Sequence, residues 1–184
     1  MTKLILVRHG ETEWDRQKRV QGALDIPLNA CGKEQAINVA DALSKLKIDD
    51  IYSSPVSCSL TTAGEIAKHH ELKVKQVQQL REPDQGMWQG LLERDVKKRY
   101  RRQYSVWKSE PVLCKPPCGE FMREAYDRAV SAFHKIVDKH KGENICLVSG
   151  GVIGSIIKSY LKNNDLKDAC RSASKENQWE VFDI

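Results

Sequence analysis

An arginine and a histidine follow directly on the first apolar segment of the chain. Residues 3–7 (KLILV) are mostly apolar, which is typical of a central parallel strand covered on both faces. Arg8 and His9 then lie at the carboxyl end of this strand, where open α/β sheets form ligand crevices. A guanidinium next to an imidazole offers a bidentate anion ligand beside a nucleophile or base, which suits a phosphate or a carboxylate. An isolated Arg-His pair would more often be an ordinary loop histidine beside a surface charge.

This pair belongs to a longer motif. RHGETEW at residues 8–14, followed by RVQG at 19–22, resembles the signature of the histidine phosphatase superfamily, the phosphoglycerate mutase-like phosphatases. The resemblance implies that His9 is phosphorylated during turnover and that Arg8 binds the phosphate. It also implies a small phosphorylated substrate and no metal or other cofactor, because phosphohistidine chemistry of this kind requires none.

Two later segments match other parts of the family's pattern. LREPDQGMWQG at residues 80–90 resembles a segment whose glutamate is the family's proton donor, which assigns that role to Glu82. Without the resemblance, Glu82 would be read as a solvated loop carboxylate. SGGVI at 149–153 resembles the family's SHGGVI, where paired glycines at a helix start can direct backbone amides at an anion. By resemblance the catalytic residues are His9 and Glu82. The implied substrate-binding residues are Arg8, Thr12, Gln21, Gly22, Ser149 and Gly150.

Three positions depart from the family's pattern. Asp15 stands where the family often has an asparagine near the phosphate, Cys58 where it has a phosphate-binding arginine, and Ser149 where it has its second catalytic histidine. A carboxylate repels a phosphate unless it is turned away or paired, and a serine cannot supply the charge of an imidazolium. Removing one preorganised donor costs about 100- to 1,000-fold in rate.

Two functions therefore stay open. The favoured one is a phosphatase, because a binding protein has no evident need of both a nucleophile and an acid. The alternative is a catalytically impaired relative that binds a phosphorylated ligand or a protein partner.

Apolar periodicity predicts strands that alternate with helices. Residues 30–46 have apolar positions at helical spacing, Asn29 can cap this helix, and residues 48–52 form the next expected strand. Ser54 and Pro55 predict a second helix start, with the serine as cap and the proline at the first helical position, and this helix runs to about residue 70. Further strands are expected at 73–77, 144–148 and 179–182, further helices at 91–108, about 121–137 and 152–161, and a polar connection at 163–177.

This order, together with the resemblance, predicts an α/β fold: a three-layer αβα sandwich with a mostly parallel central sheet, phosphoglycerate mutase-like. Residues 1–184 are expected to form a single domain with a small helical lid inserted at about 82–120. We refer to residues 82–120 as the lid segment.

The predicted helix 91–108 of the lid segment is strongly basic. Tyr100, Tyr104 and Trp107 lie at i, i+4 and i+7, so we expect one aromatic face to pack down and a cationic face to attract a phosphorylated substrate. Basic residues interleaved with aromatic ones can also bind a polynucleotide, but nucleic acid is the less favoured partner.

Composition narrows the class of protein. A domain of 184 residues buries roughly 70% of the surface that its unfolded chain exposes, which is enough for a full hydrophobic core without disulfide bonds. Six cysteines form no CxxC pair, and reduced thiols are expected. The amino-terminal apolar segment is too short for a signal peptide or a membrane span, so a cytoplasmic location and no membrane contact are expected. The oligomeric state stays open, with a dimer among the alternatives.

Overall fold

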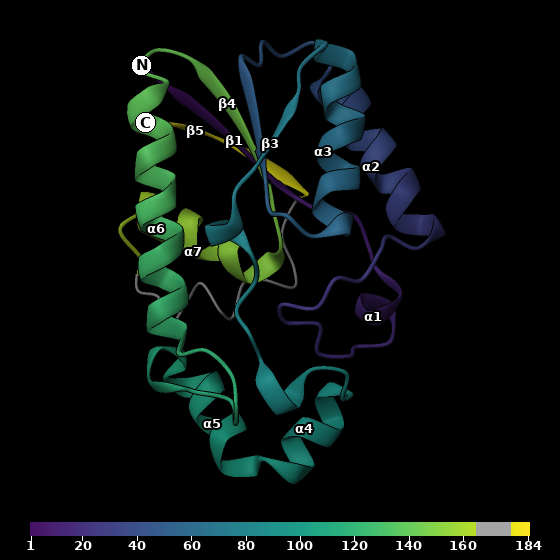
Figure 1. Cartoon of the computed structure of the whole chain (residues 1–184), viewed down its shortest axis with the longest axis vertical. Coiled ribbons are helices and arrows are strands. Elements are labelled where there is room, and N and C mark those ends of the chain that lie inside the picture. The colour runs from purple at the N-terminus through teal and green to yellow at the C-terminus, as the bar shows by residue number, and fades with distance from the viewer. Residues whose placement is uncertain (165–177) are drawn as a thin grey trace.

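Four short strands form the parallel part of the central sheet in the computed structural model, which describes residues 1–164 and 178–184 (Figure 1). The described sheet has the strand order β3-β2-β4-β1-β5, and β5 at one edge runs antiparallel to β1. The strands are β1 (Lys3–Arg8), β2 (Asp50–Ser53), β3 (Val74–Gln76), β4 (Asn144–Ser149) and β5 (Trp179–Asp183). The register pairs Arg8 with Ser149, so the loops that follow β1 and β4 leave the sheet side by side.

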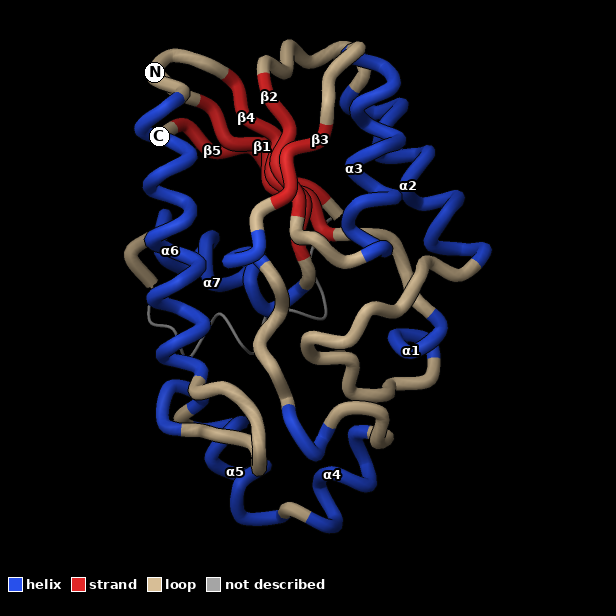
Figure 2. Tube along the Cα trace, viewed as in Figure 1, coloured by secondary structure: helices blue, strands red, loops and turns tan. Residues whose placement is uncertain are grey.

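Side chains of the central strands alternate between two apolar layers. In β1, Leu4 and Leu6 belong to the layer of α6 and α7, whereas Ile5 and Val7 belong to the layer of α2 and α3. Burying one such side chain contributes about 1.5–3 kcal/mol, so a strand covered on both faces is apolar at successive positions. The helices of the two layers are α2 (Ala30–Leu43), α3 (Ser57–His70), α6 (Met122–Lys139) and α7 (Gly151–Leu161). Figure 2 shows the sheet between these two pairs, which confirms the predicted α/β fold with its mostly parallel sheet.

The two helices on one face begin in different ways. The Asn29 side chain accepts a hydrogen bond from the Gly32 amide at 2.8 Å, as predicted for the cap of α2. The predicted start of α3 at Ser54 and Pro55 is wrong, because α3 begins at Ser57. The carboxylate of Asp25 accepts from the Ser57 amide at 2.7 Å, so a loop 32 residues earlier in the chain caps this helix. Local spacing could not reveal that contact.

The basic part of the lid segment forms two helices instead of the single predicted one. The chain breaks at Tyr100 between α4 (Glu93–Arg99) and α5 (Arg101–Ser109), and Figure 1 places both at the end of the molecule away from the termini. The rings of Tyr100, Tyr104 and Trp107 surround Trp88, with ring centroids 6.1–6.4 Å from its own. The predicted aromatic face is therefore present across the break. The remaining short helices are α1 (Glu13–Arg16), η1 (Gln78–Leu80), η2 (Gly86–Trp88) and η3 (Pro111–Leu113).

Three further sequence predictions concern the cysteines, membrane-spanning helices and the polar connection at 163–177. The five cysteines in the described residues are free thiols. Within residues 1–164 and 178–184, no helix combines the length and the apolar character needed to cross a bilayer. Most of the predicted polar connection at 163–177 lies outside the described residues.

Candidate active site

His9 follows the last residue of β1 and is 8% exposed. Its Nδ1 lies 2.7 Å from the carbonyl oxygen of Gly10. A carbonyl only accepts hydrogen bonds, so we assign the ring proton to Nδ1 and a free lone pair to Nε2. Burial lowers the pKa of His9 below its ordinary value, so the imidazole is uncharged at neutral pH. His9 therefore offers an unprotonated nitrogen to the cavity that it lines.

Glu82 lies across the amino terminus of α7. Its two carboxylate oxygens accept hydrogen bonds from the amides of Val152 at 3.0 Å and Ile153 at 2.8 Å. Burial raises the pKa of Glu82, and these two hydrogen bonds act in the opposite direction. Glu82 thus occupies two amides in the first turn of α7, directly after the glycine pair that the sequence analysis assigned to an anionic substrate.

The position opposite His9 on the neighbouring strand is Gly150. Because Arg8 pairs with Ser149, the next residues, His9 and Gly150, lie at equivalent places beyond β1 and β4. A Cβ atom at Gly150 would lie 2.4 Å from Cδ of Glu82, so the carboxyl group fills the space that a side chain there would need. Ser149 is fully buried, and its hydroxyl donates to the Gly150 carbonyl at 3.3 Å.

Ser149 was predicted to bind substrate, and it does not line the cavity that contains His9. The sequence analysis aligned the glycine pair and put Ser149 in the place of the family's histidine, whereas in the structure Gly150, one residue later, lies against Glu82. Successive side chains of a strand point to opposite faces, so a one-residue change of alignment reverses the direction of the side chain.

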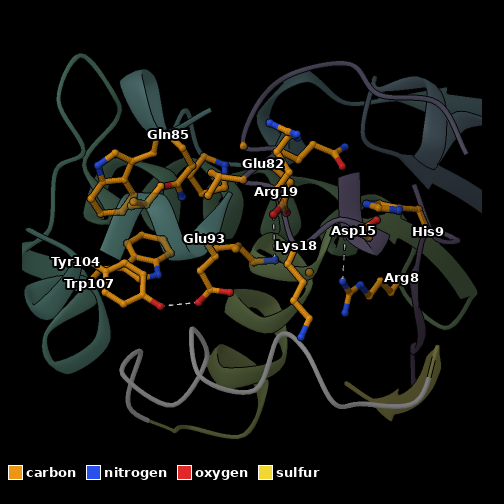
Figure 3. A pocket seen from close by; sticks show the side chains of 18 residues that line it. Arg8, His9, Asp15, Lys18, Arg19, Glu82, Gln85, Glu93, Tyr104 and Trp107 are labelled. Atoms are coloured by element: carbon orange, nitrogen blue, oxygen red, sulfur yellow. Dashed lines mark hydrogen bonds and ion pairs between the residues drawn. The ribbon is translucent and has the colours of Figure 1, made fainter. Parts of the chain in front are cut away.

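Several residues predicted from sequence line one cavity of about 640 Å³ (Figure 3). The structure brings together there Arg8, His9, Gln21, Gly22 and Glu82. Thr12 is fully buried beside it, where its hydroxyl oxygen lies 3.0 Å from Oε1 of Gln21. Thr12, Ser149 and Gly150 do not line this cavity, so Thr12 can act on a ligand only through its neighbours.

Asp15 lines the cavity but is held by its surroundings. One carboxylate oxygen accepts from the amide and the hydroxyl of Thr12 at 2.9 and 2.8 Å, completing a capping box at α1. The other oxygen lies 3.9 Å from a guanidinium nitrogen of Arg8. The carboxylate is both turned aside and paired, the two conditions under which its repulsion of a phosphate is reduced.

Cys58, at the departure from the family's arginine, is fully buried in the first turn of α3. Burial raises the pKa of its thiol to about 12, so the sulfur is neutral at physiological pH. Gln21 reaches this sulfur with its amide nitrogen at 4.0 Å. Cys58 therefore supplies neither the charge of an arginine nor a thiolate nucleophile.

The cavity also contains cations and aromatic rings that the sequence analysis did not assign to the site. Lys18 and Arg19 line it from the loop before residue 20, and Tyr104 and Trp107 line it from the lid segment. Basic residues cluster at 16–19, between the two halves of the first motif, and this cluster could have indicated that the site contains further cations. Only the fold brings α5 over the carboxyl end of β1.

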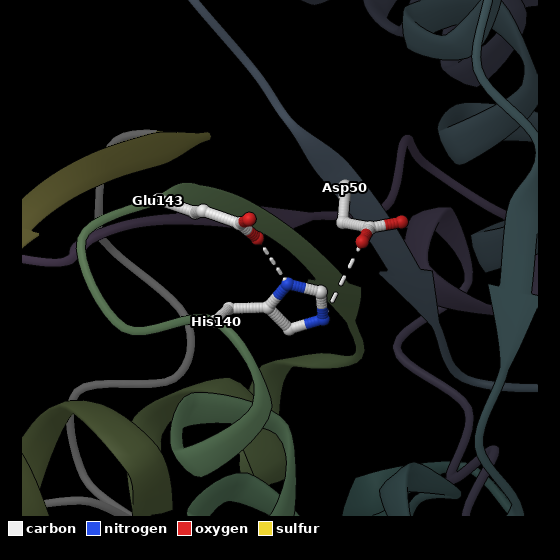
Figure 4. A group of neighbouring side chains, drawn as sticks. All are labelled: Asp50, His140 and Glu143. Carbon is white, nitrogen blue, oxygen red and sulfur yellow. Dashed lines mark hydrogen bonds and ion pairs between the residues drawn. The ribbon is translucent and has the colours of Figure 1, made fainter.

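Asp50, His140 and Glu143 form a group that could hold a metal ion, the one such group that the described residues contain (Figure 4). Their ligand atoms lie within 4.8 Å of one another at the amino ends of β2 and β4. His140 Nε2 lies 2.8 Å from the Tyr52 hydroxyl and 3.4 Å from Asp50, and Nδ1 contacts Glu143. Both ring nitrogens already have protein partners, and the group is remote from His9.

A family model described as histidine phosphatase superfamily (branch 1) matches residues 4–181. The chain is 40% identical over 158 residues to phosphoglycerate mutase-like protein 4 of Arabidopsis thaliana, covering 84% of this chain and 69% of that protein. It is 38% identical over 149 residues to phosphoserine phosphatase 1 of Hydrogenobacter thermophilus, covering 81% and 71%. The structure resembles that of YhfR from Bacillus stearothermophilus, with a TM-score of 0.89, 26% identity, and coverage of 100% and 92%.

Proposed function

Because the chain belongs to the histidine phosphatase superfamily, we propose that it hydrolyses small phosphomonoesters through a phosphohistidine intermediate on His9. The family match confirms the family predicted from the motifs, and a phosphatase is among the named relatives. Residues 1–184 then form one domain, and the lid segment is an insertion in it.

The observation that carries this proposal is that His9, with its Nδ1 on the Gly10 carbonyl, lies in one cavity with Arg8 and Glu82. In the first step Nε2 attacks phosphorus in line, an N–P bond forms, and the ester P–O bond breaks. Glu82 gives its proton to the departing alcohol. In the second step water attacks the phosphohistidine, Glu82 takes back a proton, and the N–P bond breaks to release inorganic phosphate.

The charges in the cavity suit both steps. Arg8 can hold the non-bridging oxygens, and Lys18 and Arg19 add positive charge to the same cavity. Phosphoryl transfer depends mainly on positioning and on cationic groups around the equatorial oxygens. Burial keeps His9 neutral and favours the protonated form of Glu82, as a nucleophile and an acid require.

The alternative is a catalytically impaired relative that binds a phosphorylated ligand or a protein. Two observations favour it: Cys58 is a neutral buried thiol, and Ser149, which aligns with the family's second catalytic histidine, is short and neutral and does not line the cavity. Both would reduce the rate without removing the His9 nucleophile.

One experiment separates the two functions. We expect the purified protein to hydrolyse an aryl phosphate, and a His9→Ala variant to lose that activity. His69→Ala, which removes an exposed histidine of α3, is the matched control. Incubation with phosphorus-labelled substrate and an alkaline quench should trap label in the wild type, and the label should be stable to base and labile to acid. Equal hydrolysis by the wild type and His9→Ala would reject the phosphatase.

A further inference from the structure

Glu82 lies on a stretch of chain without regular secondary structure. Residues 81–85 connect η1 to η2 and form neither helix nor strand. The carboxyl group lines the candidate active site and also a second, smaller cavity of about 280 Å³. A loop residue that borders two cavities gains less from packing than a core residue does. Its position therefore depends on how the backbone around it is held.

One ion pair holds the backbone on both sides of Glu82. Arg128 of α6 donates to both oxygens of the Glu120 carboxylate at 2.7 and 2.9 Å, a bidentate geometry that fixes direction as well as distance. The remaining guanidinium nitrogen donates to the Gln79 carbonyl at 2.5 Å, three residues before Glu82. The Glu120 carboxylate accepts from the Asp84 amide at 3.2 Å, and the Glu120 amide donates to the Asp84 carbonyl at 2.8 Å, two residues after Glu82.

This pair is partly shielded from water. The side chains of Arg128 and Glu120 are 24% and 19% exposed, and both line the smaller cavity. Arg123 and Asp127 form a second ion pair on the same helix, but both of these side chains are exposed. Exposed pairs contribute little, because water and salt screen them. The contacts of Arg128 and Glu120 are therefore the stronger ones, and they are directed at one loop.

A further contact ties the same stretch to the loop that contributes to the active-site cavity. The Arg81 guanidinium donates twice to the Ala23 carbonyl, at 2.9 and 2.7 Å. The backbone is thus anchored on both sides of Glu82, whose carboxylate reaches the amides of Val152 and Ile153. A misplacement of about 1 Å can cost about 100-fold in rate, so these anchors bear on catalysis as well as on folding.

We propose that the Arg128–Glu120 ion pair positions Glu82 for proton transfer to the leaving alcohol. Neither residue of the pair is among those that line the cavity containing His9, so neither touches the reacting atoms. They act through the backbone of residues 79–84, which holds the carboxyl group against α7. The inference rests on the proposed function and adds two positioning residues to it.

A double variant of the pair tests this role by kinetics. Arg128→Met alone leaves a partly buried carboxylate without its partner and destabilises the fold, so Arg128→Met/Glu120→Met is the main variant. We expect its kcat for an alkyl phosphate to fall roughly 10- to 100-fold, with KM within about 2-fold of the wild type. An aryl phosphate, whose leaving group needs less protonation, should be affected much less. Equal losses for both esters would indicate general damage and would overturn the positioning role.

Arg123→Met/Asp127→Met is the matched control. It removes the same two charges from α6, where Arg123 Nε lies 3.3 Å from the Asp127 carboxylate. Both esters should be hydrolysed at the wild-type rate, because this pair does not hold the loop of Glu82. A loss of alkyl phosphate hydrolysis equal to that of the first double variant would mean that any charge on α6 matters, and would overturn the proposal.

Amide exchange followed by NMR tests the positioning without turnover. The amides of Val152 and Ile153 are protected by their hydrogen bonds to the Glu82 carboxylate. In the first double variant both should exchange roughly 10-fold faster or more, while the amide of Ile157, farther along α7, keeps its wild-type rate. That result would support the positioning role even if the protein hydrolysed no ester. Unchanged exchange of Val152 and Ile153 would refute it even in an active phosphatase.

Discussion

Two buried histidines lie at opposite ends of the central sheet. His9 follows the carboxyl end of β1, and His140 precedes the amino end of β4, and they are 8% and 7% exposed. The ring of His140 is engaged on both sides, by Tyr52 and Asp50 at Nε2 and by Glu143 at Nδ1. Within residues 1–164 and 178–184, the ring of His9 has one protein hydrogen bond, at Nδ1, and it lines a cavity.

Burial alone therefore does not make a histidine reactive. The partners of His140 turn its imidazole into a connection between α6, β2 and the turn before β4, and they leave no lone pair for chemistry. The single carbonyl partner of His9 fixes its tautomer and leaves the other nitrogen available to an incoming phosphorus. The predictions below test this contrast, from the largest expected effect on activity to the smallest.

His9→Ala should abolish turnover. Loss of a nucleophile that acts together with an acid typically costs about 10⁴-fold or more in kcat. The free energy of unfolding should change little, because the ring's one hydrogen bond to the described part of the chain goes to its neighbour Gly10. Steady-state kinetics and urea denaturation measure the two quantities, and a large loss of stability would argue that His9 is a structural histidine like His140.

Glu82→Gln should reduce kcat for an alkyl phosphate by about 100- to 1,000-fold, because the alcohol must leave without a proton. An aryl phosphate, whose leaving group needs less protonation, should be affected much less. The ratio of the two losses is the measurement. Equal losses for both esters would contradict the role of Glu82 as the acid.

The activity of the wild type should pass through a maximum as the pH is raised. His9 must be unprotonated, and burial lowers its pKa below the ordinary 6.5, so activity is lost only as the pH falls through this lower value. Glu82 must be protonated, and burial raises its pKa above the ordinary 4.5, so activity is lost as the pH rises through that higher value. A pH profile of kcat/KM checks both limbs, and Glu82→Gln should remove the alkaline one.

Gly150→Ala and Ser149→Ala should differ although the residues are adjacent. A methyl group at Gly150 would overlap Glu82 and displace the carboxyl group from α7, so we expect roughly a 10- to 100-fold loss in kcat, within the range for losing a positioned acid. The Ser149 hydroxyl makes a long hydrogen bond of 3.3 Å to the next carbonyl, and the variant should keep nearly full activity. The reverse order of effects would restore the alignment that puts Ser149 in the pocket.

His140→Ala should change kcat least and stability most. Its removal leaves Tyr52, Asp50 and Glu143 without a shared partner, which costs about 1–3 kcal/mol in the free energy of unfolding. Thermal or urea denaturation measures this loss, and steady-state kinetics below the transition should be close to wild type. A fall in kcat comparable to that of His9→Ala would remove the contrast between the two rings.

Local sequence was sufficient for most elements and for part of the site. Apolar runs predicted the central strands, because a strand buried on both faces must be apolar at successive positions. The polar residues that follow such a strand must lie at its carboxyl end, which placed Arg8 and His9 at the cavity. Glu82 was assigned by resemblance, and the structure puts it in the same cavity.

Contacts between distant segments decided the rest. Asp25 caps α3 across 32 residues, and strand register selects Gly150 over Ser149 as the neighbour of Glu82. Lys18 likewise lines one cavity with Arg94 and Lys97 of α4, although these residues are more than seventy positions away in the sequence. Periodicity in a sequence reports which side chains are buried, but it does not report which buried or charged groups meet. The sequence alone therefore determined the strands and placed His9 at the carboxyl end of the first one, and the tertiary structure decided which groups surround His9.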